Sequence, residues 1–224
     1  MKLTGTVKGG RGMNEKFYHL PAEKQNAIIN AGYRVFSQNT YKKSPMQEIA
    51  DEARISKALL FHYFKNKKEL YLFLWDNAAK YSIDTLTAAG CYDMDDLFEM
   101  LYTGMKAKVE IMRQYPDMGA FVLKAYYEKD PEVAQDIQES YQSYFQWKAA
   151  HSLRNLPSEQ FISGIDMDEI FRHMFWEADG YLLDCLRNGT LDVGLLEIDF
   201  TGMIEFWKKI YGKRGERDGS EAGV

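Results

Sequence analysis

The most informative stretch of the sequence is residues 44–71, SPMQEIADEARISKALLFHYFKNKKELY. It begins with two short segments whose apolar residues recur every three or four positions, as on one face of a helix. Only Arg54 and Ile55 separate the first segment from Ser56, a candidate N-cap of the second. Two short helices joined this tightly, the second rich in polar and aromatic side chains, are typical of a helix-turn-helix. The alternative is an ordinary helical hairpin, which any all-α protein contains.

Capping residues indicate where the helices of this stretch begin. Ser44 and Gln47 form the Ser-x-x-Gln pattern of a capping box. Ser56 is the expected cap of the second short helix. Asn66, with Glu69 three residues later, is the expected cap of a long third helix. These caps predict three helices within fewer than fifty residues.

The pattern also separates an inner face from an outer one. The side chains expected to join the three helices are Ile49, Ala50, Ile55, Leu60 and Phe64. The side chains expected to face outward are Lys57, Ala58, Leu59, Phe61, His62 and Tyr63. A helix of this width fits the major groove of B-DNA, where each base pair has a distinct donor and acceptor pattern.

The rest of the sequence has the same helical spacing, with no long alternating strand pattern, so the predicted fold class is all-α. Further helices are expected at residues 21–38, 66–88, 94–114, 117–128, 131–153, 166–188 and 195–211. Glycine-rich segments at residues 1–12 and 212–224 are expected to be tails, either disordered or left from cloning.

Charge is distributed unevenly along the 224 residues, whose net charge is −5. Residues 1–12 carry three basic and no acidic side chains, residues 13–72 have a balance of +4, and residues 73–224 have a balance of −12. A basic first third followed by an acidic remainder is expected when only one end of a protein meets a polyanion. Chance clustering on a solvated surface is the alternative.

Several functional classes lack their sequence signals. No apolar run reaches the 18 residues of a membrane span, and Cys91 and Cys185 have no metal-ligand spacing, so a cytoplasmic protein without metal or cofactor is expected. The four histidines form no metal or catalytic-triad spacing, and no phosphate-binding glycine loop or nucleophile elbow is present. We therefore predict that the chain is not an enzyme.

Residues 28–74 resemble the DNA-binding domain of the tetracycline-repressor (TetR) family. The resemblance is carried by Ile28, Ala31, Phe36, Tyr41, Ser44, Ile49-Ala50, Ala53, Ile55-Ser56-Lys57, Leu60, His62-Tyr63-Phe64, Lys65-Asn66-Lys67-Lys68-Glu69-Leu70 and Leu74. It implies a helix-turn-helix DNA-binding domain at residues 13–66, joined by a long helix to a larger helical regulatory and dimerisation domain at residues 67–211.

The resemblance also implies roles for individual residues. Lys57, Ala58, Leu59 and His62 match positions that read base edges or adjoining phosphates. Tyr63, Lys67 and Ser44 match positions that contact backbone phosphate. Gln47 matches a position that reaches a base in some members, although here it is also expected in the capping box.

Three residues depart from the family pattern. Arg54 stands where the family usually has glycine in the turn, so a positive φ is expected there. Thr40 replaces the glycine before Tyr41, and Phe61 replaces a tyrosine and so has no hydroxyl for phosphate. These departures are expected to affect which operator sequence is recognised more than they affect the fold.

The family further implies a homodimer that binds a palindromic double-stranded DNA operator, represses transcription and releases the DNA when a small molecule binds the C-terminal domain. The expected dimer residues are Phe200, Met203, Ile204, Trp207 and Ile210. The expected ligand-binding residues are Tyr102, Met105, Phe121, Tyr126, Tyr141, Phe145, Met174 and Phe175. Acidic residues that would favour a cationic ligand if buried are Glu99, Glu110, Glu177 and Asp179. The alternative function is a helical small-molecule or lipid carrier that does not bind DNA.

Overall fold

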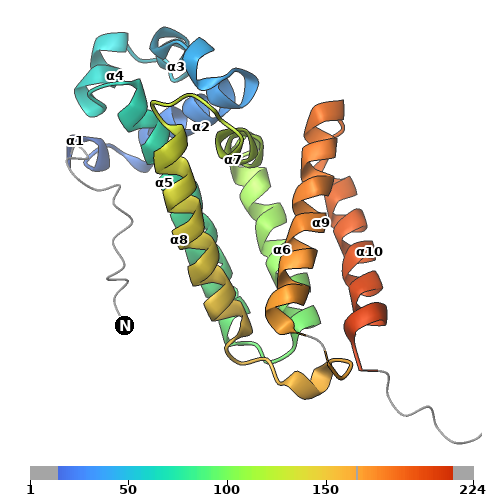
Figure 1. The fold of residues 1–224 in the computed structure, drawn as a ribbon. Helices are drawn as coiled ribbons and strands as arrows, with labels where there is room; N and C mark the ends of the chain where they lie inside the picture. The colour runs from blue at the N-terminus through green and yellow to red at the C-terminus, as the bar shows by residue number, and fades with distance from the viewer. Residues whose placement is uncertain (1–14, 165, 214–224) are drawn as a thin grey trace, which may run out of the picture. The chain divides into compact units, whose positions relative to one another are not determined.

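The computed structural model describes residues 15–164 and 166–213, and within these residues it is all-helical, as the sequence predicts (Figure 1). The expected tail at residues 1–12 and all but the first two residues of the tail at 212–224 lie outside the described residues. No helix among the described residues has the length and apolar content that crossing a membrane requires.

The helices follow the expected boundaries closely. They are α1 (Glu15–Tyr18), α2 (Ala22–Gln38), α3 (Met46–Glu52), α4 (Lys57–Tyr63), α5 (Lys67–Ala88), α6 (Leu97–Gln114), α7 (Met118–Tyr126), α8 (Ala134–Leu153), α9 (Met167–Asn188) and α10 (Val193–Tyr211). Short 3₁₀ turns precede α3 and α6 at Tyr41–Lys43 and Cys91–Asp93, and another lies at Ser158–Gln160.

Contacts divide the chain into two compact units. The first consists of Met1–Asp84 and Ile111–Trp147, and the second of Thr85–Glu110 and Lys148–Val224, each as far as it is described. The first unit contains the expected DNA-binding segment together with α7 and parts of three long helices. Because α5, α6 and α8 each contribute residues to both units, the units share continuous helices.

An aromatic cluster forms the core of the first unit. Phe121 of α7 is fully buried and its ring lies 5.3, 6.1 and 5.2 Å from the rings of Tyr33, Phe36 and Tyr71. Edge-on and tilted ring pairs at these distances are favourable beyond their buried area. The cluster therefore fixes α7 against α2 and α5, which support the helix-turn-helix.

Gly32 allows α2 to approach α5 closely. A Cβ at this position would lie 2.5 Å from Cδ1 of the buried Leu74. The neighbouring Tyr33 donates its hydroxyl to the carbonyl of Leu74 at 3.2 Å and accepts from Asn77 at 3.1 Å. These hydrogen bonds also fix the position of α2 along α5.

The short helix α1 has no counterpart among the expected helices. Its Phe17 is 1% exposed, with ring centroids of Phe64 and Phe73 at 5.2 and 5.1 Å. Four residues are too few for a periodic pattern, and burial of one ring against α5 stabilises this helix instead.

The second unit contains α9 and α10. The side chains of Asp166 and Asp192 cap these helices, and Gly189 ends α9 in the left-handed conformation with φ 67°. Trp207 of α10 donates from Nε1 to Oε2 of Glu177 on α9 at 2.6 Å. This bond joins the two helices within one protomer.

The carboxyl of Asp76 on α5 is expected to make the stability of the first unit depend on pH. Burial raises the pKa of its carboxyl to about 6, although a hydrogen bond with Ser140 of α8 lowers it. The pKa of the Asp76 carboxyl is higher in the folded state than in the unfolded state, so the fold favours the protonated form. The stability of the folded state that depends on this group is therefore fully present below about pH 4 and is lost as the pH rises to about 6. Asp76→Asn is therefore expected to raise the melting temperature above pH 6, with a gain that disappears as the pH falls to 4.

Thermal unfolding of both proteins between pH 4 and pH 8 measures this difference. Asp84→Asn is the matched control, because Asp84 lies on the same helix, is exposed and pairs with Lys80. A gain that is equal at pH 4 and pH 8 would contradict the assignment to the Asp76 carboxyl.

Candidate nucleic-acid interface

The connection between α3 and α4 is a tight turn centred on Arg54. Arg54 adopts φ 55°, and among the described residues no other non-glycine residue has a positive φ. Its N–H donates to the carbonyl of Asp51 at 3.0 Å, and that of Ile55 donates to Ala50 at 2.9 Å. The positive φ expected from the family's glycine is thus confirmed, with a non-glycine residue in a strained region.

Ser56 begins α4 as predicted. Its side chain accepts a hydrogen bond from the N–H of Leu59 at 3.1 Å. A cap here fixes the helix start two residues after the turn and so sets the direction of the side chains in the first turn of α4. Leu60 is fully buried beneath the helix.

The outer face of α4 carries most of the expected side chains. Leu59 and Phe61 are 37% and 39% exposed. The other exposed residues of this helix are Lys57, Ala58 and His62. The prediction is wrong for Tyr63, which is 8% exposed and has its ring 6.1 Å from that of Phe17. The unexpected α1 covers it, so Tyr63 belongs to the core.

The predicted capping box at α3 is also wrong. Ser44 is fully buried and donates its hydroxyl to the carbonyl of Thr40 at 3.0 Å, while the N-cap of α3 is Pro45, which makes no side-chain cap. Gln47 is exposed and donates to Oδ1 of Asp51 at 2.7 Å. The preceding 3₁₀ turn holds Ser44 inward, because its hydroxyl completes that turn.

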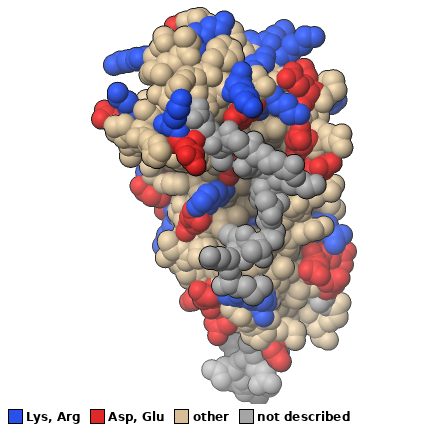
Figure 2. Space-filling view, turned by 90° about the vertical axis from the view of Figure 1, so that its left-hand side faces the viewer, with Lys and Arg blue, Asp and Glu red and all other residues tan. Residues whose placement is uncertain are grey.

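Lysine side chains surround the α3–α4 end of the first unit, where Figure 2 shows Lys and Arg gathered. The exposed ones are Lys42, Lys43, Lys57 and Lys65. Lys67 donates to the carbonyl of Lys42 at 3.2 Å, and its Nζ lies 4.6 Å from the ring centre of Tyr41. Lys68 pairs with Asp136 at 2.7 Å, which reduces its availability for DNA.

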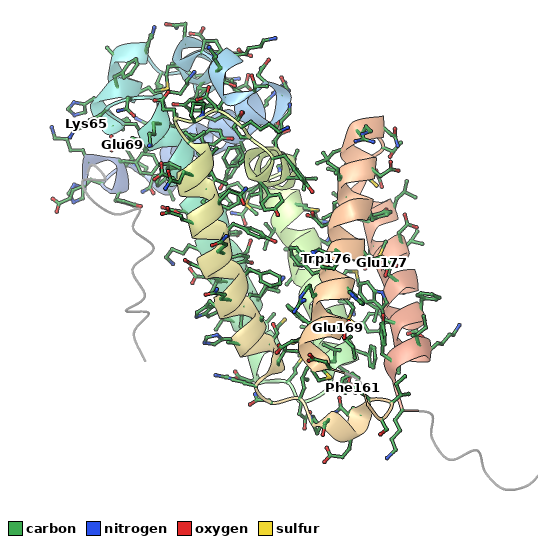
Figure 3. The ribbon with its side chains drawn as sticks, viewed as in Figure 1. Lys65, Glu69, Phe161, Glu169, Trp176 and Glu177 are labelled. Atoms are coloured by element: carbon green, nitrogen blue, oxygen red, sulfur yellow. The ribbon has the colours of Figure 1, made fainter. Side chains whose placement is uncertain are left out.

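The cap at the start of α5 fixes the position of the lysine-rich turn that leads into this helix. Asn66 accepts from the N–H of Glu69 at 2.8 Å, and Oε2 of Glu69 accepts from the N–H of Lys65 at 3.0 Å. Figure 3 shows Lys65 and Glu69 at this helix start. The prediction that Asn66 and Glu69 cap the long helix is confirmed, and the cap holds Lys65 beside α4.

The expected dimer residues lie on different sides of α10. Ile204 and Trp207 are buried within the protomer, Phe200 and Met203 are half-buried, and Ile210 is 42% exposed. Exposed apolar side chains that the expectation did not include are Leu195, Ile198 and Phe206 of α10 and Trp176 of α9, the last labelled in Figure 3. The three on α10 could have been found by asking which apolar residues lie opposite Ile204 on a helical wheel.

The expected ligand-binding residues are divided between the two units. Phe121, Tyr126, Tyr141 and Phe145 lie in the first unit, and Phe121 is fully occupied by the core. Tyr102, Met105, Met174 and Phe175 lie in the second, where the Tyr102 hydroxyl is bonded to Glu205. Within residues 15–164 and 166–213, no three His, Cys, Asp or Glu side chains are grouped in a way that would hold a metal ion.

Comparison with known proteins finds a match for one part of the first unit. Residues 28–73 match the family model "Bacterial regulatory proteins, tetR family". The chain is 39% identical over 62 residues to the transcriptional activator FasR of Mycolicibacterium smegmatis, covering 27% of this chain and 28% of FasR. It is 29% identical over 80 residues to IcaR, a negative transcriptional regulator of the biofilm operon icaADBC in Staphylococcus epidermidis, covering 35% of this chain and 43% of IcaR. These matches thus span less than half of each relative.

Solved structures extend the likeness to the whole fold. A TetR family regulator from Chloroflexus aurantiacus superposes with a TM-score of 0.56 at 21% identity, over 90% of this chain and 99% of that one. FadR from Bacillus subtilis, solved in complex with stearoyl-CoA, superposes with a TM-score of 0.63 at 17% identity, over 81% of this chain and 96% of FadR. At these identities the likeness concerns the fold.

Proposed function

We propose that the chain is a TetR-family transcriptional regulator, a repressor that binds a palindromic operator as a homodimer and releases it when a small molecule binds, since residues 28–73 match the model for that family. Such a protein acts on DNA in the cytoplasm and performs no catalysis. The observation that carries the proposal is the outer face of α4, where Leu59 and His62 are exposed on a capped helix beside four exposed lysines.

We assign the two parts of this face different tasks. Lys42, Lys43, Lys57 and Lys65 supply attraction to phosphates that does not depend on sequence, through release of counterions. Leu59 and His62 discriminate between base pairs, with about 1–3 kcal/mol for each good contact. Ala58, between these side chains, lets the helix approach the groove. Gln47 is a weaker candidate for a base contact, because its amide is already hydrogen-bonded to Asp51.

We assign Ser44, Tyr63 and Lys67 lesser roles in the proposed contact with DNA. The side chains of Ser44 and Tyr63 are buried, so contact with DNA through them requires a rearrangement. Lys67 is half-buried and keeps two ammonium protons beyond the one donated to Lys42, so one phosphate contact remains possible. We therefore expect Lys57 and Lys43 to contribute more than Lys67.

Release of DNA would depend on helix α5. Asn66 fixes its start beside α4, while its last residues belong to the second unit. A ligand that favours a different setting of α5 would change the separation of the two recognition helices, which must match half-sites about 34–36 Å apart. The ligand shifts the equilibrium only as far as its affinities for the two states differ.

Selection of bound fragments from a random DNA pool tests the proposal. We expect the wild type to select a palindromic sequence, whereas Leu59→Ala or His62→Ala should select a different base and weaken the original site by about 10- to 100-fold. Gln142→Ala, at an exposed position of α8, is the control and should select the wild-type sequence. Enrichment of no sequence by the wild type would instead favour the carrier without DNA binding.

A further inference from the structure

We propose that Glu128 is a positioning residue for DNA binding, whose carboxylate fixes the 3₁₀ turn Tyr41–Lys43 in front of α3 without itself contacting DNA. The inference rests on the proposed function, since Lys42 and Lys43 of this turn are assigned to phosphate contacts. Glu128 is acidic and lies 87 positions from Tyr41. Neither its charge nor its place in the sequence indicates a part in binding a polyanion.

The carboxylate of Glu128 joins two segments of the first unit. Its Oε2 accepts a hydrogen bond from the N–H of Tyr41, the first residue of the 3₁₀ turn, at 2.7 Å. Its Oε1 accepts from the N–H groups of Lys129 and Asp130, at 2.9 and 3.0 Å, in the connection between α7 and α8. Figure 1 shows this connection at the same end of the first unit as α3. Hydrogen bonds to an ionised acceptor are stronger than those between neutral groups, so this half-buried side chain is a firm link between the two segments.

The start of the 3₁₀ turn takes its acceptor from this distant residue. The first N–H groups of a helical turn have no carbonyl partner within it, and the preceding Thr40 makes no side-chain cap. The carbonyl of Thr40 is itself an acceptor, for the N–H of Lys43 and the hydroxyl of Ser44, both at 3.0 Å. Glu128 therefore does for the N–H of Tyr41 what a local cap does at other helix starts.

Other contacts hold the rest of the turn and leave its lysine side chains outside. The ring of Tyr41 is buried, with the ring of Tyr71 on α5 at 5.0 Å. Lys67 donates to the carbonyl of Lys42 at 3.2 Å. The side chains of Lys42 and Lys43 are both exposed. Without the bond from Tyr41 to Glu128, the beginning of the turn is free to move, and the two lysines move with it.

The direction of the effect separates positioning from simple electrostatics. DNA is a polyanion, so removal of a negative charge strengthens binding if charge alone matters. Removal of a positioning group weakens binding instead. The amide of Glu128→Gln has one acceptor oxygen, so it cannot serve both the Tyr41 turn and the α7–α8 connection. Glu128→Asp keeps the charge but is one methylene shorter, so it loses the reach to Tyr41.

Titration of the selected operator with each variant tests this direction. We expect Glu128→Asp and Glu128→Gln each to weaken operator binding by about 10-fold, because the turn loses a charge-assisted hydrogen bond. Glu139→Gln is the matched control, since it removes the same charge from an exposed position of α8 and should bind no more weakly than the wild type. Unchanged or tighter binding by both Glu128 variants would overturn the proposal.

A double-mutant cycle distinguishes this role from general support of the fold. Lys42→Ala with Lys43→Ala removes the phosphate contacts of the turn. If Glu128 acts through these lysines, adding Glu128→Asp to that protein should weaken binding by no more than about twofold. An equal loss with and without the two lysines would show that Glu128 supports the fold as a whole, and would overturn the positioning role. Should Glu128→Asp fail to fold, Glu128→Gln replaces it in the cycle.

Amide hydrogen exchange measures the same bond without DNA. The N–H of Tyr41 should exchange at least about 10-fold faster in Glu128→Asp than in the wild type, because its acceptor is lost. The N–H of Ile55, which donates to Ala50 at 2.9 Å in the turn before α4, should exchange at the wild-type rate. Unchanged exchange of Tyr41 would overturn the proposal.

The positioning role and the function on which it rests fail in different ways. Faster exchange of Tyr41 in a protein that selects no operator would overturn the regulator and leave the link between Glu128 and the turn. An operator that the wild type and both Glu128 variants bind equally would overturn the positioning role alone. Faster exchange together with weaker operator binding is the result expected if both are correct.

Discussion

Replacing both Ile198 and Phe206 by glutamate is expected to convert the protein into a monomer and to weaken operator binding by at least a hundredfold. These side chains are 66% and 53% exposed on α10, where Leu195 and Ile210 add 53% and 42% exposed apolar neighbours. Exposed apolar patches of this kind are typical of protein–protein contacts. Two carboxylates in such a contact would be desolvated without partners.

In the proposed homodimer, a second copy of the chain is the expected partner of these residues. Positions 195, 198, 202, 206 and 210 follow one side of α10, with Gly202 exposed at the centre. Leu196, Ile204 and Trp207 occupy the opposite side and are buried within the protomer. A palindromic operator requires two recognition helices, and linking two half-site contacts raises affinity by about 10²- to 10⁴-fold.

Light scattering after size-exclusion chromatography measures the change in mass, and a gel-shift titration measures the loss of DNA binding. Gln142→Glu with Gln146→Glu adds the same two charges at exposed positions of α8 and should leave both measurements unchanged. A glutamate variant that remains a dimer at micromolar concentration would place the interface elsewhere.

Local signals in the sequence were sufficient for the helix starts. Ser56 and Asn66 cap their helices because their side chains need only reach backbone N–H groups three residues away. Arg54 is strained because the turn fixes its φ whichever residue stands there. Long helices such as α5 followed from periodicity and a stop before Gly90, which adopts φ 74°.

Predictions that depended on distant parts of the chain were less successful. Tyr63 has the spacing of an outward residue, but Phe17, nearly fifty residues earlier, covers it. Ser44 has a capping pattern, but the preceding turn competes for its hydroxyl. On α10, the expected dimer residues include Ile204 and Trp207, which are buried within the protomer. Phe121 is a similar case, since its role in the core depends on aromatic partners from α2 and α5.

Reversing the charge of Lys43 and Lys57 together is expected to abolish measurable operator binding at physiological salt. Both side chains are exposed beside the recognition face, one in the 3₁₀ turn before α3 and the other at the start of α4. In a dimer the substitution Lys43→Glu with Lys57→Glu removes four positive charges and adds four negative ones. The slope of log affinity against log salt is negative, and each lost phosphate contact reduces its magnitude by about 0.9. Four lost contacts therefore reduce the magnitude by about 3.6.

The matched control is Lys106→Glu with Lys208→Glu, which changes the net charge equally at exposed positions of the second unit. If the attraction to DNA came from the net charge of the whole protein, both variants would lose affinity alike. We expect the control to retain binding within about threefold at 0.15 M salt, because charges more than a Debye length of about 8 Å from the DNA are screened. Equal losses in the two variants, or a wild-type salt slope in the Lys43 and Lys57 variant, would show that this face of α4 does not contact phosphate.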